Sequence, residues 1–201
     1  MTRLTQRRTA ETLQILCNEA VELGRFYSLA ARAQTYRNGT AGRPQQVLES
    51  IFQSSWRSLL IGLAGMLSTD QESITLSYLL DLAENHPYDF KHATPDTVKN
   101  QTSAARDRLA EFTVLEQRLR IIRDRRLAHL DRKLINEPEV VNDFVVSLDQ
   151  CREILRSIEK IIEDLYAAFY GKHKDFDALK AAFTEGLEAI FKQHKGWVDE
   201  E

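Results

Sequence analysis

A run of arginines that ends in a histidine is the strongest candidate for chemistry in this sequence. Between residues 118 and 133 the chain carries seven basic residues against two aspartates, a local charge of +5, whereas the whole chain of 201 residues carries −3. A positive stripe on an otherwise acidic chain is typical of a surface that contacts phosphate groups. A charged run can also simply solvate a helix face, so charge alone leaves nucleic-acid binding open. The basic residues are Arg118, Arg120, Arg123, Arg125, Arg126, Arg132 and Lys133.

The residue types in this run suit acid–base chemistry on a phosphodiester. An imidazole such as that of His129 populates both protonation states near neutral pH. A guanidinium donates a planar fork of N–H groups that fits phosphate oxygens. Cutting RNA through its own 2′-hydroxyl requires a base, an acid and positive charge near the phosphorus, and His and Arg supply all three.

Helical geometry decides which of these side chains could meet. On a continuous helix Arg125 and Arg126 share the face of His129, because they precede it by four and three residues. Arg123 precedes it by six and points about 120° away, so a kink or a second copy of the chain would be needed to bring both to one phosphate. His129 itself falls within about 60° of the apolar residues Leu115, Leu119 and Ile122, at the margin of the buried face. A packed core histidine is therefore an open alternative.

Composition and periodicity predict an all-α protein. Eight glycines and four prolines allow few turns, which favours long helices over a many-stranded sheet. Apolar residues recur at three- and four-residue spacing and predict helices over about residues 5–35, 45–66, 69–85, 94–130, 139–170 and 175–195. We expect one helical bundle of five or six helices that forms a single domain over residues 1–201.

Local signals predict where three of these helices begin or end. Thr69 with Glu72 fits a capping box at the start of the third helix. Thr94 followed by Pro95 is typical of a helix start, with proline at the first helical position. Gly171 is expected to end the fifth helix in the left-handed conformation.

Residues 123–131, Arg-Asp-Arg-Arg-Leu-Ala-His-Leu-Asp, resemble the signature of the HEPN superfamily. That signature is an Arg, usually followed by a polar residue, and then a His a short distance on, often with Ala just before it. The Ala-His-Leu-Asp ending, the helix with Trp56 and the 69–80 segment resemble the abortive-infection U-type (AbiU-like) branch. The resemblance implies an all-α HEPN-like fold and a metal-independent ribonuclease, often a toxin or antiviral effector, that works as a homodimer. It also implies that Arg123 and His129 are the motif pair and that Asp124 is the polar residue after the Arg.

Three hypotheses follow for the function. The first is a metal-independent endoribonuclease, a toxin or phage-defence effector, that cuts RNA at a homodimer cleft. Its catalytic residues are Arg123, His129 and Asp124, and a cognate antitoxin or inhibitor protein is a candidate partner. The second is a non-catalytic helical module of the same fold that binds RNA or a protein, and the third is a structural bundle in which His129 is packed in the core. The expected RNA-binding residues are Arg120, Arg125, Arg126, Arg132 and Lys133.

The remaining residues with reactive side chains predict no cofactor and no metal. Cys17 and Cys151 lie in apolar helical patterns, and we expect them to be small buried hydrophobic residues. A disulfide framework is then not expected, which favours a reducing compartment. The loop from His86 to His92 holds two histidines and an aspartate, but an exposed loop is the simpler interpretation than a metal site. With no secretory signal and no apolar run long enough to cross a membrane, we expect a cytoplasmic protein.

Overall fold

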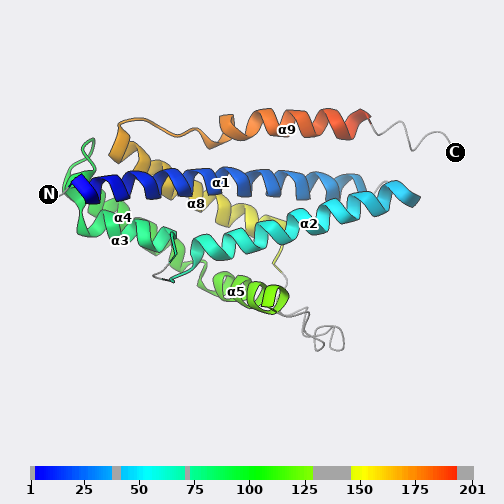
Figure 1. The fold of residues 1–201 in the computed structure, drawn as a ribbon, viewed down its shortest axis with the longest axis horizontal. Coiled ribbons are helices and arrows are strands. Elements are labelled where there is room, and N and C mark those ends of the chain that lie inside the picture. Colours follow the sequence, from blue (N-terminus) through cyan, green and yellow to red (C-terminus); the bar gives the residue numbers. More distant parts are fainter. Residues whose placement is uncertain (1–2, 38–41, 71–72, 129–145, 194–201) are drawn as a thin grey trace. The chain divides into compact units, whose positions relative to one another are not determined.

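The structure is a computed structural model, and it describes residues 3–37, 42–70, 73–128 and 146–193. Its secondary structure over these residues is helical, with no β-strand in the described ranges (Figure 1). The all-α prediction is confirmed. In chain order the elements are α1 (Arg3–Arg37), α2 (Gly42–Leu67), α3 (Leu76–Asn85), the 3-10 helix η1 (Pro87–Asp89), α4 (Pro95–Ala110), α5 (Thr113–Ala128), α8 (Leu148–Tyr170) and α9 (Phe176–Gln193).

The chain divides into two compact units. The first takes Met1–Ala20 and Leu60–Lys174, and the second takes Val21–Leu59 and Asp175–Glu201. Helices α1 and α2 each contribute one part to each unit. The expectation that residues 1–201 form a single domain stays a prediction.

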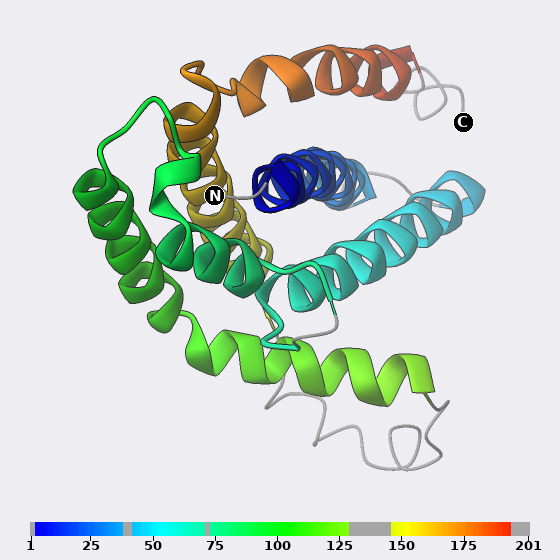
Figure 2. The same ribbon diagram turned by 60° about the vertical axis from the view of Figure 1, so that its left-hand side comes forward.

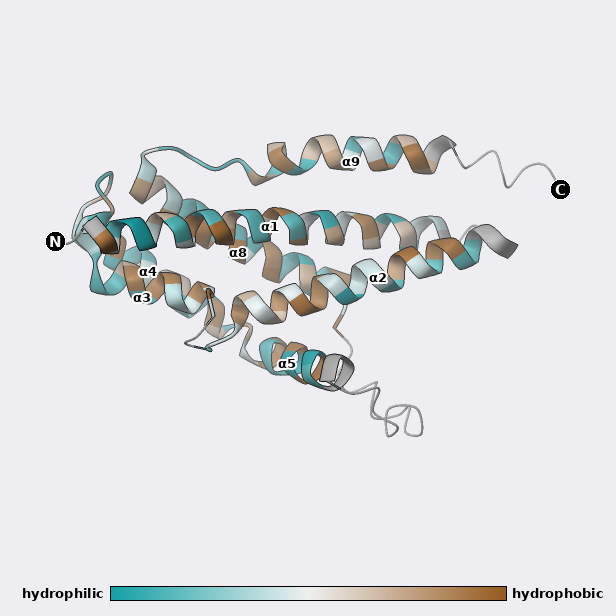
Figure 3. Ribbon diagram, in the orientation of Figure 1, coloured by the Kyte–Doolittle hydropathy of each residue, from teal (hydrophilic) through white to brown (hydrophobic). Residues whose placement is uncertain are grey.

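The core of the first unit is built from apolar side chains spaced for helices. Helix α8 shows the clearest pattern: its buried residues recur every three or four positions and alternate with polar ones along the ribbon (Figure 3). Helix α8 packs against α4, and buried side chains of α1, α2 and α3 complete the core of the same unit. The largest fully buried side chains of this unit are Phe90, Leu13, Leu16, Leu63, Leu76, Leu79, Leu80, Leu119, Ile154 and Ile158.

The second unit is held by contacts between α9 and the second half of α1. The rings of Tyr36 and Phe191 stack with their centroids 5.1 Å apart. The Arg25 guanidinium lies 5.7 Å from the centroid of the Phe183 ring. Arg32 forms an ion pair with Glu188. Helix α9 therefore packs through a mixture of aromatic and charged contacts, and Leu179 stays 42% exposed.

Two predicted helix ends are confirmed. The Thr94 hydroxyl accepts a hydrogen bond from the Thr97 amide at 3.1 Å, and Pro95 is the first residue of α4. Gly171 ends α8 with a φ of 68°, and its amide donates to the Ala167 carbonyl at 2.8 Å. The side-chain-free glycine adopts this backbone at no steric cost.

The predicted start of the third helix is wrong. Helix α3 begins at Leu76 rather than after Thr69, and Thr75 is its N-cap, accepting from the Tyr78 amide at 3.2 Å. Residues 68–70 are not helical, and the Ser68 hydroxyl accepts a hydrogen bond from the Asp70 amide. Short polar side chains that hydrogen-bond to nearby backbone favour turns over helix. The Ser68 bond therefore favours a turn at residues 68–70, and the helix begins after Thr75, which lies directly before the apolar residues of α3.

Two other boundaries differ from the sequence prediction. The helix expected over 94–130 divides into α4 and α5. The division occurs because the Phe112 amide donates a hydrogen bond to the Leu109 carbonyl, and the Thr113 hydroxyl donates one to the Ala110 carbonyl. The helix expected from residue 139 begins at Leu148. Ser147 has an extended backbone there and closes a capping box with Gln150.

Candidate nucleic-acid interface on helix α5

Helix α5 carries the first six residues of the arginine–histidine motif. It follows α4 after the turn at residues 111–112, and it runs without interruption to Ala128. Leu119 is the one fully buried side chain among residues 113–124, while Val114 is 61% exposed. A helix anchored by so few buried side chains leaves most of its surface to solvent, which is what an interface for a charged ligand requires.

Arg123 and Asp124 form a direct pair on this helix. The Arg123 Nε–H donates to the Asp124 Oδ1 at 2.9 Å, and the two side chains are 32% and 57% exposed. This bond uses the Nε–H and leaves the two terminal nitrogens without a hydrogen-bond partner within the described residues. The two terminal nitrogens form the end-on fork that can grip a phosphate, so the pair holds the guanidinium without occupying that edge.

The other expected residues are only partly described. Arg120 is exposed and precedes Arg123 by three positions, so the two are surface neighbours on α5. Arg125 and Arg126 belong to α5 by their backbone. His129, Arg132 and Lys133 lie outside the described residues. The structure thus brings Arg120, Arg123 and Asp124 together, and the position of the histidine relative to them stays a prediction.

A comparison with protein families identifies the class of this chain. A family model of the HEPN class, described as AbiU2, matches residues 10–190. The chain belongs to the AbiU2 family of HEPN proteins. No curated protein and no solved structure matches it. The motif, residues 123–131, lies well inside the matched residues. The match confirms the HEPN-like assignment for the family, and the helices of the structure confirm the all-α fold.

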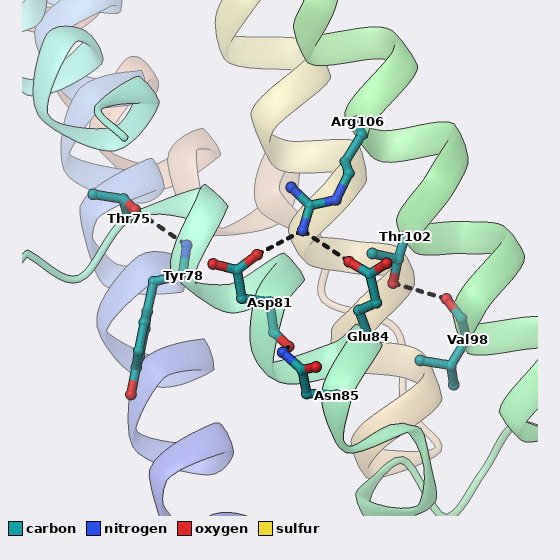
Figure 4. A network of polar contacts seen from close by, with 8 residues as sticks. All are labelled: Thr75, Tyr78, Asp81, Glu84, Asn85, Val98, Thr102 and Arg106. Carbon is teal, nitrogen blue, oxygen red and sulfur yellow. Dashed lines mark hydrogen bonds and ion pairs between the residues drawn. The ribbon is translucent and has the colours of Figure 1, made fainter. Parts of the chain in front are cut away.

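An ion cluster joins α4, the helix that precedes α5, to α3 in this AbiU2-family protein. The Arg106 Nη2 atom of α4 lies 2.6 Å from Asp81 Oδ1 and 3.0 Å from Glu84 Oε2, both on α3 (Figure 4). The two carboxylates raise the pKa of the Arg106 guanidinium against the opposing effect of its partial burial. Sequence analysis missed this cluster, although acids three residues apart on one helix face were a usable signal.

The cysteines of the AbiU2-family chain have no features of reactive groups. Cys17 and Cys151 are fully buried, as predicted. Burial raises the pKa of the Cys17 thiol to about 11 and that of the Cys151 thiol to about 12. Both thiols are therefore protonated at neutral pH, whereas a nucleophilic cysteine acts as the thiolate.

Neither a metal-binding cluster nor a membrane-spanning helix is present in the described part of the chain. No group of three or more His, Cys, Asp or Glu side chains there is arranged to hold a metal ion, and this includes the loop from His86 to His92. None of the helices in those residues has the length and apolar character needed to cross a bilayer.

Proposed function

We propose that this AbiU2-family protein is an endoribonuclease that cuts single-stranded RNA without a metal ion, as a toxin or phage-defence effector. The observation that carries the proposal is the motif itself. Arg123 stands on a basic helix and is held by Asp124 through its Nε–H, and its terminal nitrogens have no hydrogen-bond partner within the described residues, in a chain of the HEPN class. Fixed positive charge of this kind stabilises a phosphorane transition state by a few kcal/mol.

The chemical step is a transfer within the RNA. One His129 takes the proton of a ribose 2′-hydroxyl, and the 2′-oxygen attacks the adjacent phosphorus. The bond from phosphorus to the 5′-oxygen breaks, and a second imidazole protonates that leaving oxygen. The products are a 2′,3′-cyclic phosphate and a 5′-hydroxyl, so no water or metal enters the balance.

The two opposite proton transfers favour a homodimer. A single histidine in a fixed position cannot be the base for one oxygen and the acid for another at the same moment. A two-fold axis between two copies of the chain would supply two His129 and two Arg123 to one cleft. On a single continuous helix Arg123 and His129 point about 120° apart. In a dimer the Arg123 of one copy and the His129 of the other could reach the same phosphate in spite of this separation.

The remaining basic residues would hold the RNA backbone. Arg120 is exposed beside Arg123 on α5, and we assign Arg125, Arg126, Arg132 and Lys133 the same role. Each phosphate contact adds to affinity and makes binding weaker as salt rises. A cognate antitoxin or inhibitor protein that covers this basic surface is a further expected partner.

The test is cleavage of RNA by the purified protein in excess EDTA. We expect products with a 2′,3′-cyclic phosphate, and we expect His129→Ala and Arg123→Ala to lower the cleavage rate by about 100-fold or more. His86→Ala and Arg156→Ala are the matched controls, because both residues are exposed and lie outside the motif. Cleavage by His129→Ala at the wild-type rate would contradict the assignment. Salt-dependent RNA binding with no cleavage by any form would identify a non-catalytic module.

A further inference from the structure

A second group of basic side chains gathers at the end of α8, apart from the motif. We name it the basic–aromatic cluster, and we propose that it is a binding surface for single-stranded RNA. Its members come from two segments that are far apart in the sequence, the loop around η1 and the residues that follow α8. They are Tyr88, Lys91, His92, Lys172, His173 and Lys174.

Backbone and side-chain contacts bring the two segments together within the first unit. The His92 amide donates to the Ala168 carbonyl at 3.0 Å, which ties the loop to the last turn of α8. The His92 ring packs so closely over Gly171 that an added Cβ there would lie 2.7 Å from His92 Nδ1. Figure 2 shows the loop around η1 beside the end of α8. Lys91 and Lys172, the neighbours of His92 and Gly171 in sequence, are thereby placed at the same end of the unit.

The charge of this surface is positive because the two segments carry three lysines against one exposed carboxylate, that of Asp175. Asp89 lies in the loop around η1 but is 2% exposed. Glu163 of α8 lies with its Oε1 3.4 Å from the Nδ1 of His173, whose side chain is 83% exposed. Lys91, His92 and Lys172 are exposed as well. An exposed positive surface of this kind attracts a polyanion.

Aromatic rings beside the charges point to nucleic acid rather than to an acidic protein. Tyr88 is 68% exposed, so its ring is available to an unpaired base. Lys174 Nζ lies 5.4 Å from the centroid of the Tyr166 ring, which itself packs against Tyr170 at 4.5 Å. Positive side chains that follow a backbone, with rings on which bases stack, are the usual means of binding single strands.

The cluster does not belong to the motif surface. Figures 1 and 2 both show the end of α8 well separated from α5. The choice of RNA, rather than single-stranded DNA, as the natural ligand rests on the proposed ribonuclease function. The cluster would then hold a segment of the substrate away from the bond that is cut.

Binding of an RNA that cannot be cut tests the cluster independently of cleavage. The probe is a short fluorescein-labelled 2′-O-methyl oligouridylate, whose blocked 2′-oxygen prevents the reaction, and fluorescence anisotropy gives its Kd. We expect Lys91→Gln/Lys172→Gln to raise the Kd about tenfold at low salt and to lower the slope of log K against log salt by about 0.7 for each lysine. Arg57→Gln/Arg156→Gln removes two exposed positive charges elsewhere and should change the Kd less than about twofold.

The tyrosine provides a second, uncharged test. Tyr88→Ala should raise the Kd about fivefold or more, while Tyr88→Phe should keep the wild-type value, because stacking needs the ring and not the hydroxyl. Equal Kd values for the lysine pair and its control would overturn the proposal. So would a lowered unfolding temperature with unchanged Kd, which would show that the lysines only stabilise the α8 C-terminus. Equally tight binding of poly-glutamate would overturn the assignment to nucleic acid. At saturating RNA these variants should cut at the wild-type rate, so loss of binding here and failure of the ribonuclease function give different results.

Discussion

Asp124 accepts a hydrogen bond from the Nε–H of Arg123, and in the proposed mechanism this bond positions the guanidinium. We expect Asp124→Ala to lower kcat for RNA cleavage about tenfold with little change in KM, because the guanidinium loses its fixed orientation while the basic surface remains. Asp124→Asn should recover part of the rate, since its amide oxygen can still accept from Nε. The measurement is steady-state cleavage of a labelled RNA.

The control for this prediction is Asp107→Ala. Asp107 is exposed on α4, outside the motif, and its replacement by alanine removes the same negative charge as Asp124→Ala does. Equal rates for Asp124→Ala and Asp107→Ala would show that the Arg123–Asp124 bond is an ordinary surface ion pair, which contributes little.

The two buried thiols predict how stability depends on pH. Their pKa values of about 11 and about 12 lie above the usual value for a free thiol. In the unfolded chain the thiols lose protons from about pH 9 upward, whereas in the folded chain they keep them, so the unfolded state binds fewer protons in that window. The free energy of unfolding should therefore fall between about pH 9 and pH 11, by at most about 1.4 kcal/mol per pH unit for each thiol.

Denaturant unfolding at several pH values measures this effect. The double variant Cys17→Ala/Cys151→Ala should be less stable near neutral pH, because it loses buried volume, but its stability should fall less steeply above pH 9. Parallel pH curves for the two proteins would mean that the thiols do not titrate differently in the folded and unfolded states.

At the scale of the helix, α8 depends on the cap that fixes its first turn. The Ser147 hydroxyl accepts from the Gln150 amide at 3.1 Å, and the Gln150 side chain accepts from the Ser147 amide at 2.9 Å. Ser147→Ala should reduce the free energy of unfolding by about 1 kcal/mol. Ser103→Ala, at an exposed position inside α4, should leave it unchanged or slightly higher. Thermal and denaturant unfolding of both variants provides the comparison, and equal stability would rule out the cap as a contribution.

Helix types and apolar faces could be predicted from the sequence, while several ends could not. The Thr94–Pro95 start and the Gly171 end were predictable because each signal stands directly beside the apolar pattern. Thr69 and Thr75 both precede a helix-like pattern, and the choice between them depends on which threonine lies next to the buried run of Leu76 and its neighbours. The break before Thr113 has no Gly or Pro to signal it, since it arises from the Thr113 hydroxyl bonding to a carbonyl three residues back.

At the scale of the whole molecule, the sequence identified the motif and its family, because Arg123, Asp124 and His129 lie within one short segment. The structure places the first two in contact on α5, and the family comparison agrees with the HEPN assignment. The basic–aromatic cluster was not predictable in this way. Its two segments, around residues 91 and 172, each look like an ordinary exposed loop until folding brings them together.

The central claim is that two copies of the motif form one active site, and mixed dimers test it most directly. Two differently tagged chains, one wild type and one His129→Ala, are co-expressed, and the heterodimer is purified through both tags. The proposed mechanism requires both imidazoles in one cleft, and it predicts that the heterodimer cuts RNA at no more than about a hundredth of the wild-type homodimer rate. A heterodimer of wild type with His86→Ala should keep the full rate. A wild-type/His129→Ala heterodimer that retains half of the rate would show that each chain works alone and would contradict the account.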